Sequence, residues 1–107
     1  MLIIVSRSFT LFEGNYAVKR ISQRDAAILI RENSKELVAA LPFESTAKVL
    51  TKMTGVQMDW ETNPTVPPPY PGDKILSVRL LDGVNKKVVY DDLRLDHLDF
   101  FLIEYTS

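Results

Sequence analysis

The chain has no cysteine, only one histidine and no long apolar run among its 107 residues. Without cysteine it forms neither disulfides nor thiolate zinc sites, which fits a reducing cytoplasm. A lone histidine without cysteine argues against a transition-metal site, so we expect no metal and no cofactor. Every apolar run is far shorter than the roughly 20 residues that span a bilayer, so we expect no membrane partner. Residues 1–5 lack the basic leader of a signal peptide and predict a first strand.

A basic excess is missing as well. Lysine and arginine number 13 against 14 aspartates and glutamates, so the formal net charge is −1. Domains that bind duplex nucleic acid usually carry a basic excess, because phosphate neutralisation dominates their affinity. We therefore expect no duplex nucleic acid as partner, although a small nucleotide needs only a few local donors. The sequence also lacks a glycine-rich phosphate loop, a hydrolase elbow and a metalloprotease helix.

What is present is the composition of one globular domain. Hydrophobic residues make up 46% of the chain and charged residues 25%, which predicts a single domain over residues 1–107. The apolar patterns predict strands at 2–6, 16–21, 37–41, 74–81 and 100–105, a short strand at 56–58, a short extended piece at 88–90, and helices at 23–32, 45–54 and 91–97. This order predicts an α+β fold, with two main helices packed on a mixed or antiparallel sheet of about five strands.

The start of the second main helix is the most informative segment. It follows the strand at 37–41 and a proline, and we expect Ser45 or Glu44 to cap it and Gly55 to end it in a left-handed conformation. The amides of a first helical turn have no partner inside the helix and carry the positive end of its dipole. This junction therefore favours an anionic ligand. Ser45 and Thr46 are equally typical of an ordinary helix cap, and that interpretation stays open.

Residues 60–73 hold five of the six prolines of the chain. Proline lacks the amide that a strand ladder needs, so we expect an extended loop that is partly polyproline. The loop is either a plain connector or a contact surface for another protein, with Trp60 and Tyr70 as aromatic anchors. The sequence leaves both interpretations open.

Six short segments, spread over most of the chain, carry a family resemblance. They are Ser8-Phe9-Thr10-Leu11, Glu44-Ser45-Thr46-Ala47, Val49-Leu50, Thr54-Gly55-Val56, Gly72-Asp73-Lys74-Ile75-Leu76 and Arg79-Leu80-Leu81-Asp82-Gly83. Together with the aromatic closing strand they resemble the small viral ring-nuclease family, the type III anti-CRISPR proteins of archaeal viruses and their bacterial and phage relatives. The resemblance implies a symmetric homodimer that binds a cyclic oligoadenylate, the second messenger of type III CRISPR defence, across its two-fold axis. It also implies metal-free cleavage, in which a ribose 2′-hydroxyl attacks the adjacent phosphate, a histidine before the second helix protonates the leaving oxygen, and an arginine and a glutamate assist.

The chain departs from the family pattern at the proton donor. The family's Gly-His aligns with Pro42-Phe43, and phenylalanine cannot transfer a proton. Loss of a general acid typically costs about 10²–10⁴-fold in rate. The family's Arg-Leu-x-Glu-Gly matches residues 79–83 with the shorter acid Asp82, and a second family arginine falls at Trp60. The resemblance therefore implies that the groups that hold an anion are partly kept and that the proton-transfer group is lost.

The candidate ligand-binding residues include no catalytic residue. They are Arg7, Ser8, Thr10, Phe43, Ser45, Thr46, Arg79 and Asp82. The planar fork of Arg79 suits phosphate, although an arginine on a strand is ordinarily solvated or ion-paired. Turn chemistry alone explains Asp82, and we expect the single histidine, His97, to be exposed.

Two hypotheses follow from these residues. The first is a viral or mobile-element anti-defence protein of the host cytoplasm that binds and sequesters a cyclic oligonucleotide second messenger, with weak or absent cleavage. The alternative is a protein-binding inhibitor module that acts through the proline-rich loop between Trp60 and Tyr70. Whether the chain is an enzyme stays open, because His97 or Asp82 could replace the missing acid.

Overall fold

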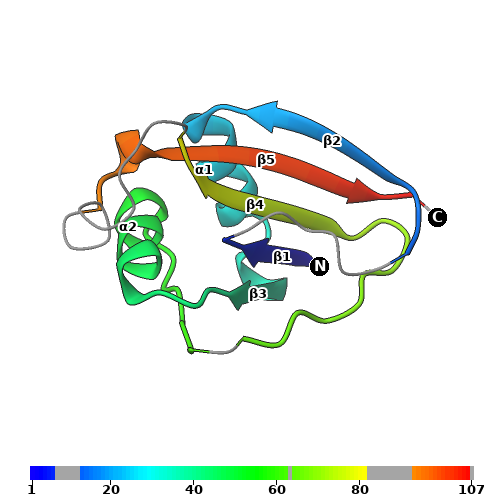
Figure 1. Ribbon diagram of the computed structural model, residues 1–107, viewed down its shortest axis with the longest axis horizontal. Coiled ribbons are helices and arrows are strands. Elements are labelled where there is room, and N and C mark those ends of the chain that lie inside the picture. Colours follow the sequence, from blue (N-terminus) through cyan, green and yellow to red (C-terminus); the bar gives the residue numbers. More distant parts are fainter. Residues whose placement is uncertain (7–12, 63, 82–92, 107) are drawn as a thin grey trace.

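Five strands form one mixed sheet in the computed structural model, which describes residues 1–6, 13–62, 64–81 and 93–106 (Figure 1). The strands are β1 (Leu2–Val5), β2 (Tyr16–Ile21), β3 (Leu37–Ala40), β4 (Lys74–Leu80) and β5 (Leu98–Tyr105), in the spatial order β2-β5-β4-β1-β3. The helices are α1 (Gln23–Glu32) and α2 (Glu44–Thr54), with single 3₁₀ turns η1 (Ser34–Glu36) and η2 (Leu95–His97). The predicted α+β class, with two main helices on a five-stranded mixed sheet, is confirmed.

The sheet has a part with parallel pairing and a part with antiparallel pairing, because only β5 runs opposite to the other four strands. β1 pairs in parallel with both β3 and β4, whereas β5 runs antiparallel to both β4 and β2. Parallel pairing requires a crossover connection, and α1 and α2 lie in the two connections that lead from β1 to β3 and from β3 to β4. As a result, the carboxyl ends of β1, β3 and β4 lie side by side at one edge of the sheet.

The main core lies between the sheet and the two helices. Alternation along β4 sends Leu76 and Val78 into this core, while Ile75 joins a smaller apolar cluster on the opposite face. From the helices, the buried residues of the main core are Ala26, Leu29, Ile30, Ala47 and Leu50. Both faces of the central strands are therefore buried, which explains the near-continuous apolar sequence of β1.

The face without helices is more open over β2 and β5. Val18 is 59% exposed there, and the rings of Tyr16 and Tyr105 lie 5.3 Å apart between centroids. Desolvation raises the pKa of the Tyr16 hydroxyl, and the neighbouring Tyr105 raises it further. Val66 of the proline-rich segment packs against the smaller cluster under the central strands. The proline-rich segment thus covers part of this face instead of projecting freely.

Local signals in the sequence place the helix boundaries. Ser22 caps α1 by accepting a hydrogen bond from the Asp25 amide to its Oγ at 3.0 Å, which is one half of the predicted capping box. α2 ends as predicted at Gly55, whose φ of 75° is a left-handed conformation that favours glycine. At its other end α2 differs from the prediction, since Phe43 and not Ser45 or Glu44 occupies the cap position.

The predicted strand at 56–58 is wrong. This segment is not in the sheet, because the amide of Met58 donates to Thr51 Oγ1 of α2 at 3.0 Å instead of to a neighbouring strand. Burial of Met58, which is 2% exposed, accounts for the apolar pattern that suggested a strand. The extended piece predicted at 88–90 lies outside the described residues, and the predicted helix at 91–97 is described from residue 93 on, where it is the single turn η2.

Prediction of an exposed His97 was also wrong. The side chain is half-buried, and its Nδ1 accepts a hydrogen bond from the Arg94 amide at 3.1 Å. Its Nε2 lies 3.2 Å from a guanidinium nitrogen of the same arginine. Both ring nitrogens of the only histidine of the chain therefore contact Arg94, the residue that precedes η2.

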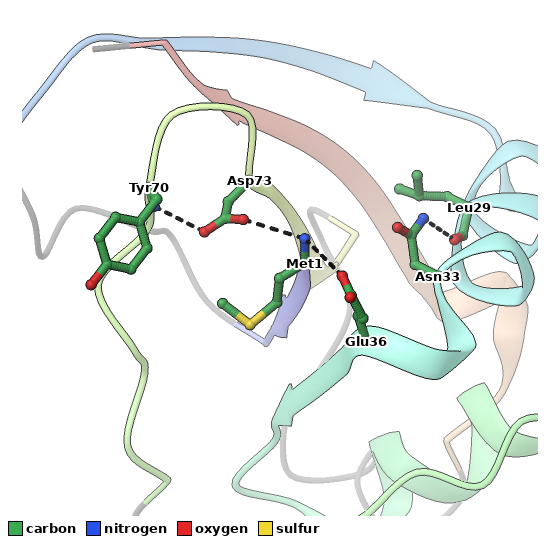
Figure 2. A network of polar contacts seen from close by, with 6 residues as sticks. All are labelled: Met1, Leu29, Asn33, Glu36, Tyr70 and Asp73. Atoms are coloured by element: carbon green, nitrogen blue, oxygen red, sulfur yellow. Dashed lines mark hydrogen bonds and ion pairs between the residues drawn. The ribbon is translucent and has the colours of Figure 1, made fainter.

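The amino ends of the parallel strands are tied together by polar contacts (Figure 2). The ammonium group of Met1 lies 3.3 Å from Asp73 Oδ1 and 3.8 Å from Glu36 Oε2. The second oxygen of Asp73 accepts a hydrogen bond from the Tyr70 amide at 2.9 Å. This network joins the end of the proline-rich segment to the first residue ahead of β1.

Candidate ligand site at the carboxyl edge of the parallel strands

Three neighbouring strands end at the same edge of the sheet, and α2 begins there. The segment from Leu41 to Phe43 leads from β3 directly into α2, and the Glu61 amide donates to the Leu41 carbonyl at 3.0 Å. In open sheets with parallel strands, ligands bind in the crevice outside the carboxyl ends of the strands. This edge is therefore the first place to look for a site.

The first turn of α2 has no side-chain cap. Phe43 occupies the cap position with extended backbone, φ −126° and ψ 131°, and its ring offers no oxygen to the amides that follow. The first backbone bond of the helix runs from the Ala47 amide to the Phe43 carbonyl at 3.3 Å. The amides of Glu44, Ser45 and Thr46 accordingly have no partner within the helix. Such donors ordinarily favour a cap oxygen or an anion.

The side chains at this helix start differ in exposure. Phe43 is 36% exposed, Ser45 is half-buried and Thr46 is 3% exposed. The Thr46 side chain is therefore part of the interior face of α2, and any contact that Thr46 makes to a ligand comes from its backbone amide. Phe43 and Ser45 keep side-chain surface that a ligand can reach.

Arg79 lies on β4 one residue before that strand ends. Its guanidinium carbon stands 4.7 Å from the centre of the Phe101 ring, and its Nε donates to Ser77 Oγ at 3.2 Å. Asp99 faces Arg79 across the β4–β5 pair but is engaged by Arg20 at 2.8 Å. Within the described ranges Arg79 forms no ion pair, so its charge is oriented by an aromatic ring without being neutralised.

Ser6 contributes a polar group that sequence reasoning missed. This residue directly follows β1, and its hydroxyl oxygen is buried with no hydrogen-bond partner among the described residues. A buried hydroxyl without a partner is unfavourable, and native structures hold few of them. The only sequence signal was its place after a buried strand, beside the predicted candidates Arg7, Ser8 and Thr10.

A hollow runs along α2 from the same helix start. It has a volume of about 330 Å³ and is lined by Glu44, Ala47, Lys48, Thr51, Lys52, Gln57, Met58 and Trp60. Trp60 is 45% exposed, so part of its surface remains open to a ligand. Sequence reasoning had not selected Lys48 and Lys52, although their spacing of four residues places them on one face of a helix.

The structure separates the two aromatic anchors of the proline-rich loop. Trp60 lies beside α2 at the carboxyl edge, next to the Glu61–Leu41 hydrogen bond. Tyr70, which is 70% exposed, lies at the amino ends of the parallel strands with Asp73 and Met1 (Figure 2). A partner that contacts both rings must therefore reach across the length of the parallel strands.

Four of the predicted ligand residues, Arg7, Ser8, Thr10 and Asp82, lie outside the described residues. Of the other four, Phe43, Ser45 and Thr46 lie together at the start of α2, whereas Arg79 lies near the end of β4 on the face opposite the helices, with Ser77 and Phe101. Among the described residues no three His, Cys, Asp or Glu side chains come together as a metal site would need, and no helix there is long and apolar enough to cross a membrane.

The fold is shared with a viral protein. The chain superimposes on B116 of Sulfolobus turreted icosahedral virus with a TM-score of 0.68, covering 97% of this chain and 98% of that one. Sequence identity is 17%, so the likeness shows the fold alone. No protein-family model matches the sequence, and no curated protein matches it significantly.

Proposed function

We propose that this protein is a viral or mobile-element anti-defence protein that binds a cyclic oligonucleotide second messenger of the cyclic oligoadenylate type and sequesters it in the host cytoplasm. In this proposal the ligand lies at the carboxyl edge of the parallel strands, closed in by the second protomer of a homodimer. Its phosphates are held by the amides at the start of α2 and by Arg79, and its cleavage is slow or absent.

The observation that carries the proposal is the uncapped start of α2. Phe43 occupies the position at which the side chain of a serine, threonine or aspartate would accept from the amide of Ser45 or Thr46. Those amides lie at the edge where parallel strands commonly place ligands, and Arg79 on β4 carries a charge that no described residue neutralises. Backbone donors and a guanidinium are the groups that phosphodiesters prefer.

Phe43 also explains why we propose slow or absent cleavage of the ring. A leaving ribose oxygen needs a proton, and the ring of Phe43 has none to give. Its partly exposed face can instead stack on a base, a contact worth about 1–3 kcal/mol. Binding without turnover would make the protein a sink for the signal.

The proposal is supported in outline by the viral neighbour, B116, whose fold the chain shares. The choice of a cyclic oligoadenylate as ligand rests on the segments that resemble ring nucleases and on the geometry of the carboxyl edge. It is testable with purified protein.

Isothermal titration of the protein with cyclic tetra-adenylate, cyclic trinucleotides and cyclic dinucleotides tests the proposal. We expect saturable heat with at least one ring and a rise in melting temperature, because a ligand that binds only the native state stabilises it. Chromatography of the same mixtures after prolonged incubation should recover the intact ring. Absence of heat and of a thermal shift with every ring would eliminate the proposal, and rapid linear product would replace sequestration with catalysis.

A second candidate function is inhibition of a protein partner through the proline-rich loop. The strong exposure of Trp60 and Tyr70 favours it, since aromatic side chains of this kind are enriched at interface hot spots. The double variant Trp60→Ala, Tyr70→Ala should then lose capture of the partner while keeping its melting temperature. Undiminished capture by that variant would count against this function.

A further inference from the structure

We propose that the hollow along α2 is a nucleotide subsite, in which a purine base stacks on Trp60 and its phosphate lies against Lys48 and Lys52. This inference rests on the proposed function, because the hollow begins at the helical turn that would hold the ring. It adds a base-recognition site that neither the family resemblance nor the viral neighbour supplies.

The size and lining of the hollow fit a nucleotide. Its volume of about 330 Å³ falls at the lower end of the roughly 300–1,000 Å³ typical of small-molecule sites. Ala47 and Met58, each 2% exposed, supply apolar lining, and the 45% exposed indole of Trp60 supplies a π surface. Bases of every kind stack on such a ring, which makes the contact tolerant of sequence.

The charges of the hollow fit a phosphate. Lys48 and Lys52 are one helical turn apart, and within the described ranges Lys52 has no carboxylate partner. Lys48 is paired with Glu44 at 3.0 Å, but both side chains are more than half exposed, so the pair contributes little and a phosphate can displace it. The two lysines outweigh the single carboxylate of the lining and leave a net positive site.

Some polar groups of the hollow are already hydrogen-bonded within the protein, and others remain available to a ligand. The Thr51 hydroxyl has no proton left to donate, since it donates to the Ala47 carbonyl at 2.8 Å, and it also accepts from the Met58 amide at 3.0 Å. The Gln57 amide nitrogen donates to the Met58 carbonyl at 3.3 Å, which leaves its carbonyl oxygen able to accept from an exocyclic amine. A base with an amino group, such as adenine, therefore suits the site better than one without.

Trp60 is the only tryptophan of the chain, so its fluorescence reports on this hollow alone. The experiment titrates the wild-type protein with cyclic tetra-adenylate and follows heat and Trp60 emission in parallel. We expect saturable quenching of Trp60 emission, with a Kd equal to the Kd found by calorimetry. Heat with unchanged Trp60 emission would overturn the subsite while leaving the proposed function standing, whereas no heat with any ring would overturn both.

Variants separate stacking from packing. Trp60→Ala should bind the ring roughly 5- to 150-fold more weakly, and Trp60→Phe should recover most of that loss because the π face is restored. Tyr70→Ala is the matched control, since it removes an exposed ring from the far end of the same loop and should leave the affinity unchanged. Equal affinity of Trp60→Ala and wild type, or a loss that Trp60→Phe does not recover, would refute base stacking.

The phosphate half of the subsite has its own test. The double variant Lys48→Gln, Lys52→Gln should weaken binding of the ring about two- to tenfold and flatten its dependence on salt. Lys35→Gln is the matched control, because Lys35 is an exposed lysine of η1, which precedes β3 at the opposite end from α2. An unchanged salt dependence in the double variant would show that the lysines do not touch the phosphate.

Discussion

The two main helices begin in contrasting ways. At the start of α1 the Ser22 hydroxyl accepts a hydrogen bond from the Asp25 amide at 3.0 Å, whereas at the start of α2 the side chain of Phe43 has no oxygen that could accept one. A missing cap typically costs about 0.5–2 kcal/mol, so the second arrangement is the less stable one. The uncapped helix follows β3, next to the carboxyl ends of β1 and β4, whereas α1 follows β2 at the other side of the sheet. The contrast suggests that stability is built into one helix start and binding capacity into the other.

The same contrast holds for the two ends of the parallel strands. At the amino ends, the ammonium group of Met1 lies within 3.8 Å of the carboxylates of Asp73 and Glu36 (Figure 2). At the carboxyl ends, Arg79 has no described carboxylate partner and the Ser6 hydroxyl has no described hydrogen-bond partner. Unsatisfied polar groups are costly in a folded protein, and their collection at one edge is typical of a binding site.

The largest effect is expected from Phe43→His, which places a proton donor at the start of α2. If the ring binds there, its cleavage should accelerate by up to about 10²–10⁴-fold, because a general acid is restored where the ring-nuclease resemblance puts one. Product chromatography at a fixed concentration of cyclic tetra-adenylate measures the rate. Phe43→Asn is the control, since it can cap the helix but cannot transfer a proton. A Phe43→His protein that binds the ring as tightly as wild type and leaves it intact would contradict the proposed geometry.

The next largest effect is expected from Arg79→Gln. Hydrogen bonds to a charged group contribute about 1.5–3 kcal/mol, so affinity for the ring should fall roughly 10- to 150-fold. Calorimetry measures the loss, with Arg24→Gln, an exposed arginine of α1, as the control of equal charge. The melting temperature should change little, because Arg79 has no described ion pair to lose. Equal affinities of the two variants would remove Arg79 from the site.

Phe43→Asp should have two opposite effects: the protein should become more stable, and it should lose binding of the ring. The carboxylate can accept from the amides of the first turn, which should stabilise the protein by about 0.5–2 kcal/mol as judged from the urea midpoint. Loss of the packing of the Phe43 ring offsets part of this gain in stability, and the offset is limited because Phe43 is already 36% exposed. The same carboxylate occupies the position of the anion, so binding of the ring should disappear. A variant that gains stability and still binds would show that the ligand lies elsewhere.

The smallest effect on binding is expected from Ser22→Ala. Removal of the α1 cap should lower the free energy of unfolding by about 1 kcal/mol, because the Asp25 amide loses its acceptor. Affinity for the ring should stay at the wild-type value, since α1 follows β2, which lies at the opposite side of the sheet from β3 and the start of α2. Urea unfolding and calorimetry on the same preparation check both statements. Reduced affinity in this variant would show that the two helix starts are not independent.

Local chemistry made part of this structure predictable. Ser22 and Gly55 mark helix ends by mechanisms that act within a few residues, and the alternation from Lys74 to Leu80 reveals the two faces of β4. The segment at 56–58 was misread because burial of Met58 against α2 produces the same apolar pattern as burial in a sheet. Periodicity alone cannot distinguish these two environments.

The candidate site was predictable only in part, because some of its residues are close in sequence and others are brought together by the fold. Phe43, Ser45 and Thr46 are adjacent in sequence, so the helix start could be located without the fold. Two features depend on segments far apart in the chain: the position of the Trp60 indole in the α2 hollow and the engagement of Asp99 by Arg20. No pattern within one segment encodes such relations.

The sequence by itself determined the α+β class, the two helices and the absence of a proton donor at residue 43, because these depend on composition and on short-range spacing. Only the tertiary structure decided the strand order β2-β5-β4-β1-β3, and with it the edge where three parallel strands end beside α2. Strand order is set by the burial of both sheet faces over the whole chain, a cooperative property that no local stretch of residues carries.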